Sequence, residues 1–379
     1  MSWLQHLPVL PVVIPLVAGA VMLLFAEPRR ATRTFIALSA TLANLAVAAL
    51  LVYMANRGMP EIWPGGIAVY LLGGWEAPFG IVLVADRLSA VMLMLTAVLA
   101  LASLVYALAR WKRMGPHFQS LFQFLIMGVN GAFLTGDLFN LFVFVEVLLA
   151  ASYGLLLHGL GAARVKAGLH YIVINLAASL VFLIGVALIY GASGTLNMAD
   201  LAVRVPGLDD GDRILFEAGA AILGVAFLVK AGAWPLNFWL PAAYGAAAAP
   251  VAAAFSILTK VGIYALLRLG SLLSASGAPA PFNDGWLFGI GMITLALYRG
   301  HAERAATPAV GGVLRHCVSR HAIGGARVGG RGDERRSDIL SGQFCVGDRR
   351  FFHAERNDRA YPAIWRQRDR RFAGIIRPR

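Results

Sequence analysis

The sequence has little charge and very little cysteine. Charged residues make up 14% of its 379 residues, against about 25% in a typical soluble protein. Both cysteines, Cys317 and Cys345, lie near the C-terminal end, so neither a disulfide framework nor a cysteine metal site supports the rest of the chain. A phosphate-binding loop and a serine–histidine arrangement with supporting context are also missing. These absences argue against a soluble enzyme, and we expect no cofactor and no metal.

Apolar residues dominate instead. Hydrophobic residues make up 59% of the chain and the mean hydropathy is +0.69, which is typical of a membrane protein. Residues 1–297 hold 15 basic and 12 acidic residues, whereas residues 298–379 hold 18 basic residues, all arginine, and 8 acidic ones. We therefore divide the chain into a transmembrane domain, 1–297, and an arginine-rich tail, 298–379, which we expect to be disordered.

The apolar runs predict an all-α, multi-pass membrane protein with about eight complete transmembrane helices and a partial ninth. Each complete run is close to the roughly 20 residues that cross about 30 Å of hydrocarbon. The expected spans are about 7–26, 34–54, 88–109, 119–135, 138–158, 168–191, 214–231 and 248–268, with a ninth that begins near Trp286. Between the sixth and seventh spans, the more polar segment 191–213 predicts a short interfacial helix.

Basic residues alternate between successive loops. The loops after spans one, three and five are rich in them: Arg29, Arg30, Arg33, Arg110, Lys112, Arg113, Arg164 and Lys166. The other loops hold few basic residues and most of the acidic ones. By the positive-inside rule, the odd-numbered loops are cytoplasmic and the N-terminus is outside.

Three ionisable residues lie within apolar spans: Glu146 in span five, Lys230 at the end of span seven, and Lys260 in span eight. A charge at such a depth costs about 2.5–3.5 kcal/mol on insertion scales, and such residues usually serve ion or proton movement. Glu146 could instead form an ion pair that only fixes helix packing. Either lysine could extend its ammonium group to the membrane interface. We favour proton or cation translocation for all three.

Span seven is predicted to be broken just after Lys230. Gly232 and Pro235 follow the lysine directly, and proline removes a backbone donor and clashes with the preceding helical turn. Broken helices are tolerated at membrane depth where they are buried in protein or line a watered cavity. The break therefore indicates a buried polar site beside Lys230.

Several long motifs resemble one family. FNLFVFVEVLLAASYGLL, HYIVINLAASLVFLIGVALIYGASGTLNMADLA, KAGAWPLNFWLPAAY and LTKVGIYALLR are similar to the antiporter-like membrane subunits shared by respiratory complex I and the Mrp-type multisubunit cation/proton antiporters. Trp239, Leu240, Pro241 and Tyr244 resemble the Mrp D subunits in particular. The resemblance covers about residues 1–297.

The resemblance implies a subunit of a Na⁺ or K⁺/proton antiporter in the bacterial inner membrane, working with partner subunits and without nucleic acid. It also implies that Glu146, Lys230 and Lys260 match the family's buried glutamate and lysines. The first five-helix repeat would lie within about 119–268, and a second, inverted repeat has no counterpart in the chain. On this ground we expect the chain by itself to be inactive. One alternative is a proton-pumping subunit of an NADH–quinone oxidoreductase, and the other is a non-transporting membrane scaffold.

The tail is interpreted as an out-of-frame translation. After Leu297 the ninth apolar run stops, and no later segment has a run that could cross a bilayer. If the first base of each codon is dropped and synonymous codons are chosen freely, residues 340–354 can be read as the apolar sequence YLVSSVLATGAFFML. A basic tail that touches anionic lipid is the alternative.

Overall fold

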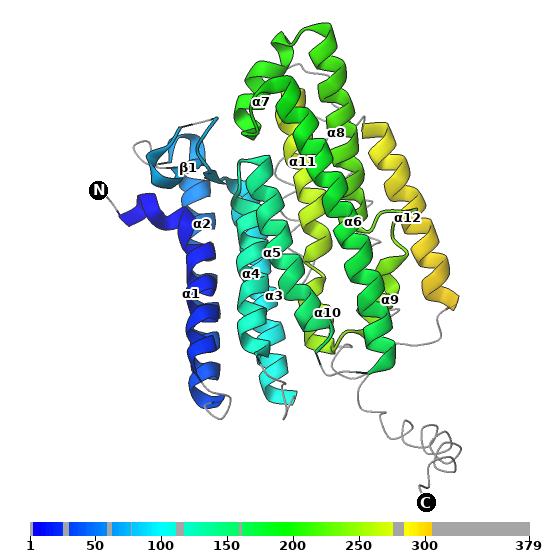
Figure 1. The fold of residues 1–379 in the computed structure, drawn as a ribbon. Helices are drawn as coiled ribbons and strands as arrows, with labels where there is room; N and C mark the ends of the chain where they lie inside the picture. Colours follow the sequence, from blue (N-terminus) through cyan, green and yellow to red (C-terminus); the bar gives the residue numbers. More distant parts are fainter. Residues whose placement is uncertain are drawn as a thin grey trace, which may run out of the picture.

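The computed structural model describes residues 3–25, 30–58, 63–76, 78–110, 117–158, 161–275 and 284–304. This part of the chain is mostly helical, as predicted, and its long helices run side by side (Figure 1). The prediction of a disordered tail at 298–379 falls, beyond Arg304, outside the described residues.

Ten α-helices lie within or along the expected spans. They are α1 (Leu10–Leu24), α2 (Arg30–Arg57), α3 (Arg87–Arg110), α4 (Phe118–Leu134), α5 (Leu138–Leu156), α6 (Ala162–Ser193), α8 (Asp210–Ala231), α10 (Ala249–Phe255), α11 (Leu258–Ala275) and α12 (Asp284–Arg304). Seven segments among the described residues are long and apolar enough to cross a membrane, and α4, with 17 residues, is slightly shorter. Its length still suffices for a span.

Two short helices complete the set. Helix α7 (Met198–Arg204) confirms that the segment between spans six and seven forms a helix, and the Asn197 side chain caps it by accepting from the backbone N–H groups of Ala199 and Asp200. Helix α9 (Trp239–Ala246) lies between α8 and α10. The chain thus turns back into helix soon after the break that follows Lys230.

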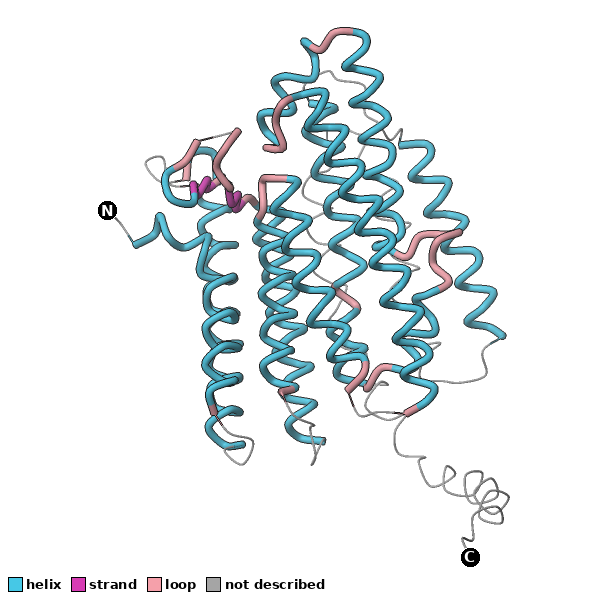
Figure 2. The backbone as a smooth tube through the Cα atoms, viewed as in Figure 1, coloured by secondary structure: helices cyan, strands magenta, loops and turns pink. Residues whose placement is uncertain are grey.

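A small sheet, which was not expected, covers one end of the bundle. Strands β1 (Ala68–Leu71) and β2 (Val82–Ala85) pair antiparallel, and Figure 2 shows them near the N-terminal end of the chain. Bridges then join Leu83 to Thr135, and Asp137 to Asn197. The Leu138 N–H donates to the Leu196 carbonyl and the Met198 N–H donates to the Gly136 carbonyl, at 2.9 and 2.8 Å. The tight turn between α4 and α5 is therefore tied by its backbone to the segment that follows α6.

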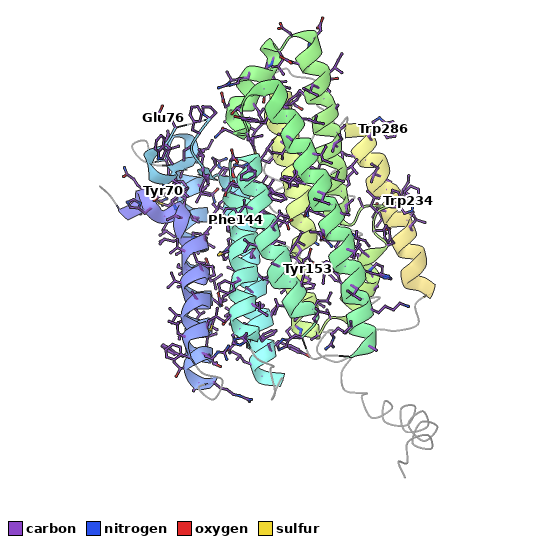
Figure 3. The ribbon with its side chains drawn as sticks, viewed as in Figure 1. Tyr70, Glu76, Phe144, Tyr153, Trp234 and Trp286 are labelled. Carbon is purple, nitrogen blue, oxygen red and sulfur yellow. The ribbon has the colours of Figure 1, made fainter. Side chains whose placement is uncertain are left out.

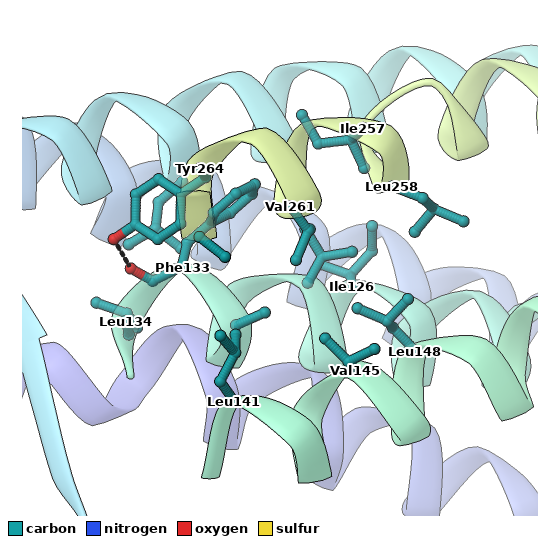
Figure 4. Packing of buried hydrophobic residues seen from close by; sticks show 14 of the residues in the cluster. Ile126, Phe133, Leu134, Leu141, Val145, Leu148, Ile257, Leu258, Val261 and Tyr264 are labelled. Carbon is teal, nitrogen blue, oxygen red and sulfur yellow. Dashed lines mark hydrogen bonds between the residues drawn. The ribbon is translucent and has the colours of Figure 1, made fainter. Parts of the chain in front are cut away.

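The buried core runs through the middle of the bundle around α4 and α5. Almost every residue of α4 is buried, and Figure 4 shows Ile126, Phe133, Leu141, Val145 and Val261 packed between α4, α5 and α11. An apolar core between helices gains its stability from close packing, because lipid is as apolar as the side chains that it would replace. Helices α5, α6, α8 and α11, which carry the predicted site residues, are held by this core.

Helix α12 continues beyond the apolar run that was expected to end the ninth span. Its apolar part is Trp286–Leu297, but the helix extends to Arg304. The apolar run thus ends at Leu297 as expected, but residues 298–304, the start of the tail expected to be disordered, are helical. The Thr294 hydroxyl oxygen of α12 accepts the backbone N–H of Trp234 at 2.9 Å, and Figure 3 shows Trp234 beside this helix. Helix α12 thus satisfies a backbone donor in the break between α8 and α9.

Candidate functional site

Glu146 and Lys230 meet through a third residue, Ser179. The Lys230 ammonium group on α8 donates to the Ser179 hydroxyl oxygen on α6 at 3.0 Å. The Ser179 hydroxyl in turn donates to Oε1 of Glu146 on α5. Three neighbouring helices therefore contribute one polar group each to a continuous chain of hydrogen bonds.

Small residues allow α6 and α8 to approach closely beside this chain. A Cβ added at Gly185 would lie 2.8 Å from the backbone nitrogen of Leu223, and one added at Gly219 would lie 2.9 Å from Cβ of Leu188. Small residues at such a crossing let two helix backbones come together in a membrane. Ser179 lies less than two turns from Gly185, so this crossing brings its short side chain within reach of Lys230.

The helix break after Lys230 has the geometry that the sequence predicted. Helix α8 ends at Ala231, and Gly232 adopts the left-handed conformation, with φ of +68°, which glycine adopts without steric cost. The N–H groups of Gly232 and Ala233 donate back to carbonyl groups of the last turn, and the indole N–H of Trp239 donates to the Val229 carbonyl at 3.1 Å. Pro235 lies in the turn between α8 and α9.

Lys230 is buried, with 8% of its surface exposed. Its ammonium group donates to the Ser179 hydroxyl within the protein. The lysine also lies in the last turn of α8, where the negative end of the helix dipole favours a cation. Glu146 is half-buried and, rather than pairing directly with a lysine, accepts from Ser179.

A small cavity adjoins Lys230. It leaves about 20 Å³ open to the centre of a water molecule, which is about the space that one buried water needs. Its polar lining comes from Lys230, Asn175 and Tyr171, and its apolar lining comes mainly from α5 and α11. The Tyr171 hydroxyl is 2.8 Å from the Ser152 hydroxyl, so buried hydroxyl groups continue from the cavity toward α5. Figure 3 shows Tyr153, whose ring contacts that of Tyr171, in this region.

Lys260 is not part of the Glu146–Ser179–Lys230 chain. It lies half-buried in the first turn of α11, and its ammonium group donates to the Thr259 hydroxyl oxygen at 3.3 Å. The neighbouring residues Leu258 and Val261 line the cavity, so Lys260 lies on the helix that borders the cavity without lining it. A Cβ added at Gly262 would lie 2.7 Å from the Phe227 carbonyl, so α11 packs tightly against the end of α8.

Three features of the site were missed from the sequence. Ser179 gave no signal beyond a serine in an apolar run. Span eight is divided into α10 and α11 between Phe255 and Leu258, where the Tyr244 hydroxyl of α9 donates to the Phe255 carbonyl. Asp86, to which the sequence analysis gave no role, pairs with the buried Arg268 of α11 at 2.9 Å. Among the residues that the structure describes, no group of three or more histidine, cysteine or acidic side chains could hold a metal ion.

Comparisons with known proteins agree with the motifs. Residues 135–302 match the family described as "NADH:quinone oxidoreductase/Mrp antiporter, TM". The chain is 58% identical over 297 residues to the D subunit of a probable K⁺/H⁺ antiporter of Rhizobium meliloti (strain 1021), an alignment that covers 78% of this chain and 55% of the relative. It is 42% identical over 273 residues to the D subunit of a Na⁺/H⁺ antiporter of Alkalihalophilus pseudofirmus, which covers 71% and 53%.

A solved structure shows the same architecture. The chain superposes on a chain of the Mrp complex from Dietzia sp. DQ12-45-1b with a TM-score of 0.70 and 29% identity, over 86% of this chain and 59% of that one. The chain spans about half the length of the curated relatives that it matches. It is a multi-pass membrane protein, and its residues 135–302 match the transmembrane domain described for the NADH:quinone oxidoreductase/Mrp antiporter family.

Proposed function

We propose that this chain forms the proton-translocating membrane part of a subunit of a multisubunit K⁺ or Na⁺/proton antiporter. The observation that carries the proposal is the buried chain of hydrogen bonds from Lys230 through Ser179 to Glu146. Ionisable groups at this depth are expensive and usually functional. The names of the relatives in Rhizobium meliloti and Alkalihalophilus pseudofirmus support this choice of reaction and ions.

Protons would pass along Glu146, Lys230 and Lys260. Glu146 and Lys230 are joined by the hydrogen bonds through Ser179, and the cavity beside Lys230 has room for one water that extends the path. From there the path follows α11 toward Lys260. The break after Lys230 keeps the lysine at a helix end, where backbone groups and side chains can rearrange around a changing charge. Partner subunits of the complex couple this movement to the cation.

The subunit would lie in the inner membrane of a bacterium with its N-terminus outside. The basic loops after spans one, three and five support this orientation. It places the backbone hydrogen bonds between Met198 and Gly136, and between Leu138 and Leu196, at the outer side of the membrane. A cysteine introduced at Asp209, in the loop between α6 and α8, should react with an impermeant thiol reagent added to whole cells. Labelling only after the cells are broken would indicate the opposite orientation.

A proton-pumping subunit of an NADH–quinone oxidoreductase is the second candidate, because the matched family includes both kinds of complex. The neighbouring genes distinguish the two, since an antiporter operon encodes the other antiporter subunits. A strain that lacks the gene should become sensitive to Na⁺ or K⁺ and keep its NADH–quinone reductase activity. Loss of that reductase activity with unchanged salt tolerance would favour the second candidate.

The direct test is cation-driven proton movement in everted membrane vesicles that contain the complete complex. Glu146→Gln and Lys230→Ala should each abolish the recovery of a pH-sensitive dye after KCl or NaCl is added. A matched control is Glu217→Gln, because Glu217 is an exposed residue of the first half of α8. If Glu146→Gln leaves antiport intact in the assembled complex, the subunit acts as a scaffold and the proposal is wrong.

We expect the 379-residue chain, purified alone and reconstituted in liposomes, to carry no proton flux. The proposed reaction needs partner subunits, and the chain spans about half the length of its curated relatives. Proton flux above that of empty liposomes, lost in the Glu146→Gln variant, would contradict this expectation.

A further inference from the structure

We propose that the Ser179 hydroxyl is the group that carries a proton between Lys230 and Glu146. This inference deepens the proposed function and rests on it. The hydroxyl accepts from the Lys230 ammonium group at 3.0 Å and donates to Oε1 of Glu146. Within the described part of the chain, direct ion pairs join Arg204 to Asp200 and Arg268 to Asp86. Lys230 and Glu146 are instead joined through the Ser179 hydroxyl.

The burial of Ser179 and Lys230 favours transfer through the hydroxyl over transfer through bulk water. Ser179 is 3% exposed and Lys230 is 8% exposed. The cavity that adjoins Lys230 is lined by neither Ser179 nor Glu146. Hydrogen bonds in such surroundings are stronger than in water and polarise one another.

The bonding of Ser179 differs from that of other hydroxyl residues in the spanning helices. Thr41, Thr96 and Ser193 donate to the backbone carbonyl four residues earlier, which is the usual way for serine and threonine to satisfy a hydroxyl within a helix. Ser179 directs its single proton to the Glu146 carboxylate instead. A serine that served only to fill space between α6 and α8 would not need this side-chain partner.

The transfer step balances without any further reactant. The Ser179 O–H bond breaks as its proton moves to Oε1 of Glu146, and a proton of the Lys230 ammonium group moves to the Ser179 oxygen. The net result is a neutral lysine, a protonated glutamate and an unchanged hydroxyl that now donates toward Lys230. The reverse step restores the charged pair. Ser179 thus relays the proton and is not consumed.

The test compares Ser179→Ala, Ser179→Thr and the control Ser193→Ala in the complete complex. Antiport is measured in everted vesicles over a range of pH, and assembly is measured by the amount of intact complex in the membrane. Ser179→Ala should lower the antiport rate at least about tenfold, because a positioned proton-transfer group contributes about 10²–10⁴-fold, and it should change the pH profile. Ser179→Thr keeps the hydroxyl and should retain at least half of the rate.

Each outcome either supports or overturns the proton relay through Ser179. If Ser179→Ala assembles and keeps more than half of the rate with an unchanged pH profile, the relay is wrong. If Ser179→Ala does not assemble, the threonine variant decides: a retained rate supports the relay, and a lost rate in assembled complex overturns it. Loss of antiport in Glu146→Gln and Lys230→Ala together with normal Ser179→Ala overturns the relay alone, whereas normal antiport in Glu146→Gln overturns the proposed function.

Discussion

The hydroxyl of Tyr264 on α11 donates to the backbone carbonyl of Phe133 at 2.6 Å, and the two rings meet edge to face (Figure 4). Phe133 lies in the last turn of α4, where carbonyl groups lack helical partners. The bond therefore connects the helix that carries Lys260 to the helix that leads into α5 and Glu146. It joins residues that are 131 positions apart in the sequence.

Tyr264→Phe should destabilise the protein by about 1–3 kcal/mol, because it leaves a buried carbonyl without a partner. The ring and its contact with Phe133 remain, so the change removes only what the hydroxyl contributes. Thermal unfolding in detergent measures the effect. Tyr190→Phe is the matched control, since Tyr190 is 54% exposed and its change should stay within about 0.5 kcal/mol. Equal stability of the two variants would show that the carbonyl finds another donor.

Gly262→Ala should separate α11 from α8 beside Lys230. Its Cβ would lie 2.7 Å from the Phe227 carbonyl and 2.9 Å from the Ala231 backbone nitrogen, and backbone atoms cannot move aside alone. Gly270→Ala on the same helix meets no atom within 4 Å. Both variants gain the same helix propensity, so the difference between their unfolding free energies, about 1–3 kcal/mol, measures the overpacking cost.

A difference near zero between Gly262→Ala and Gly270→Ala would mean that α11 shifts freely against α8. Antiport by the two variants adds a second readout in the complete complex. Because the crossing at Gly262 adjoins the end of α8, Gly262→Ala should also slow antiport, whereas Gly270→Ala should leave the rate unchanged.

Asp137→Asn should stabilise the protein at neutral pH. Asp137 caps α5 by accepting from the Asn140 N–H at 2.8 Å, and asparagine caps a helix equally well. Burial raises the pKa of Asp137 above 3.8, although hydrogen bonds from Asn140 and Phe139 oppose the shift. Because the carboxyl pKa is higher in the folded than in the unfolded protein, the charged carboxylate lowers the free energy of unfolding at pH values above the folded-state pKa. This loss is absent below the unfolded-state pKa.

The gain of Asp137→Asn should therefore be present at pH values well above the raised pKa and disappear as the pH falls to about 3.8. Thermal unfolding at neutral pH and at that lower pH tests this. Asp137→Ala is the control: it removes both the charge and the cap, and the lost cap costs about 1 kcal/mol at either pH. A gain of the same size at both pH values would show that Asp137 has no raised pKa.

The nucleotide sequence across codon 297 tests the interpretation of residues 298–379. If these residues are read out of frame, the alternative frame should be open and should encode further apolar runs of about 20 residues. Early stop codons in the alternative frame would end this interpretation.

A residue of the site could be predicted from the sequence only where its presence in a membrane helix costs much free energy. Glu146 and Lys230 stood out because a charge inside an apolar run is expensive, and the break after Lys230 followed from Gly232 and Pro235. Ser179 was not found because one hydroxyl in a membrane helix costs little and therefore leaves no signal. The division of span eight was not found either, since the interruption at Phe255 has no glycine or proline and depends on the hydroxyl of Tyr244, from another helix.

The backbone junction between the start of α5 and the segment after α6 determines how the site can move. The two bonds that join Gly136 and Leu138 to Met198 and Leu196 involve no side chain, so they oppose any sliding of α5 along α6. Glu146 lies eight residues from Leu138, about 12 Å along the helix. Movement of α5 that separates the carboxylate from Ser179 is then a tilt or rotation of the helix about this end. A small tilt of α5 about this hydrogen-bonded end therefore displaces Glu146 farther than it displaces Leu138.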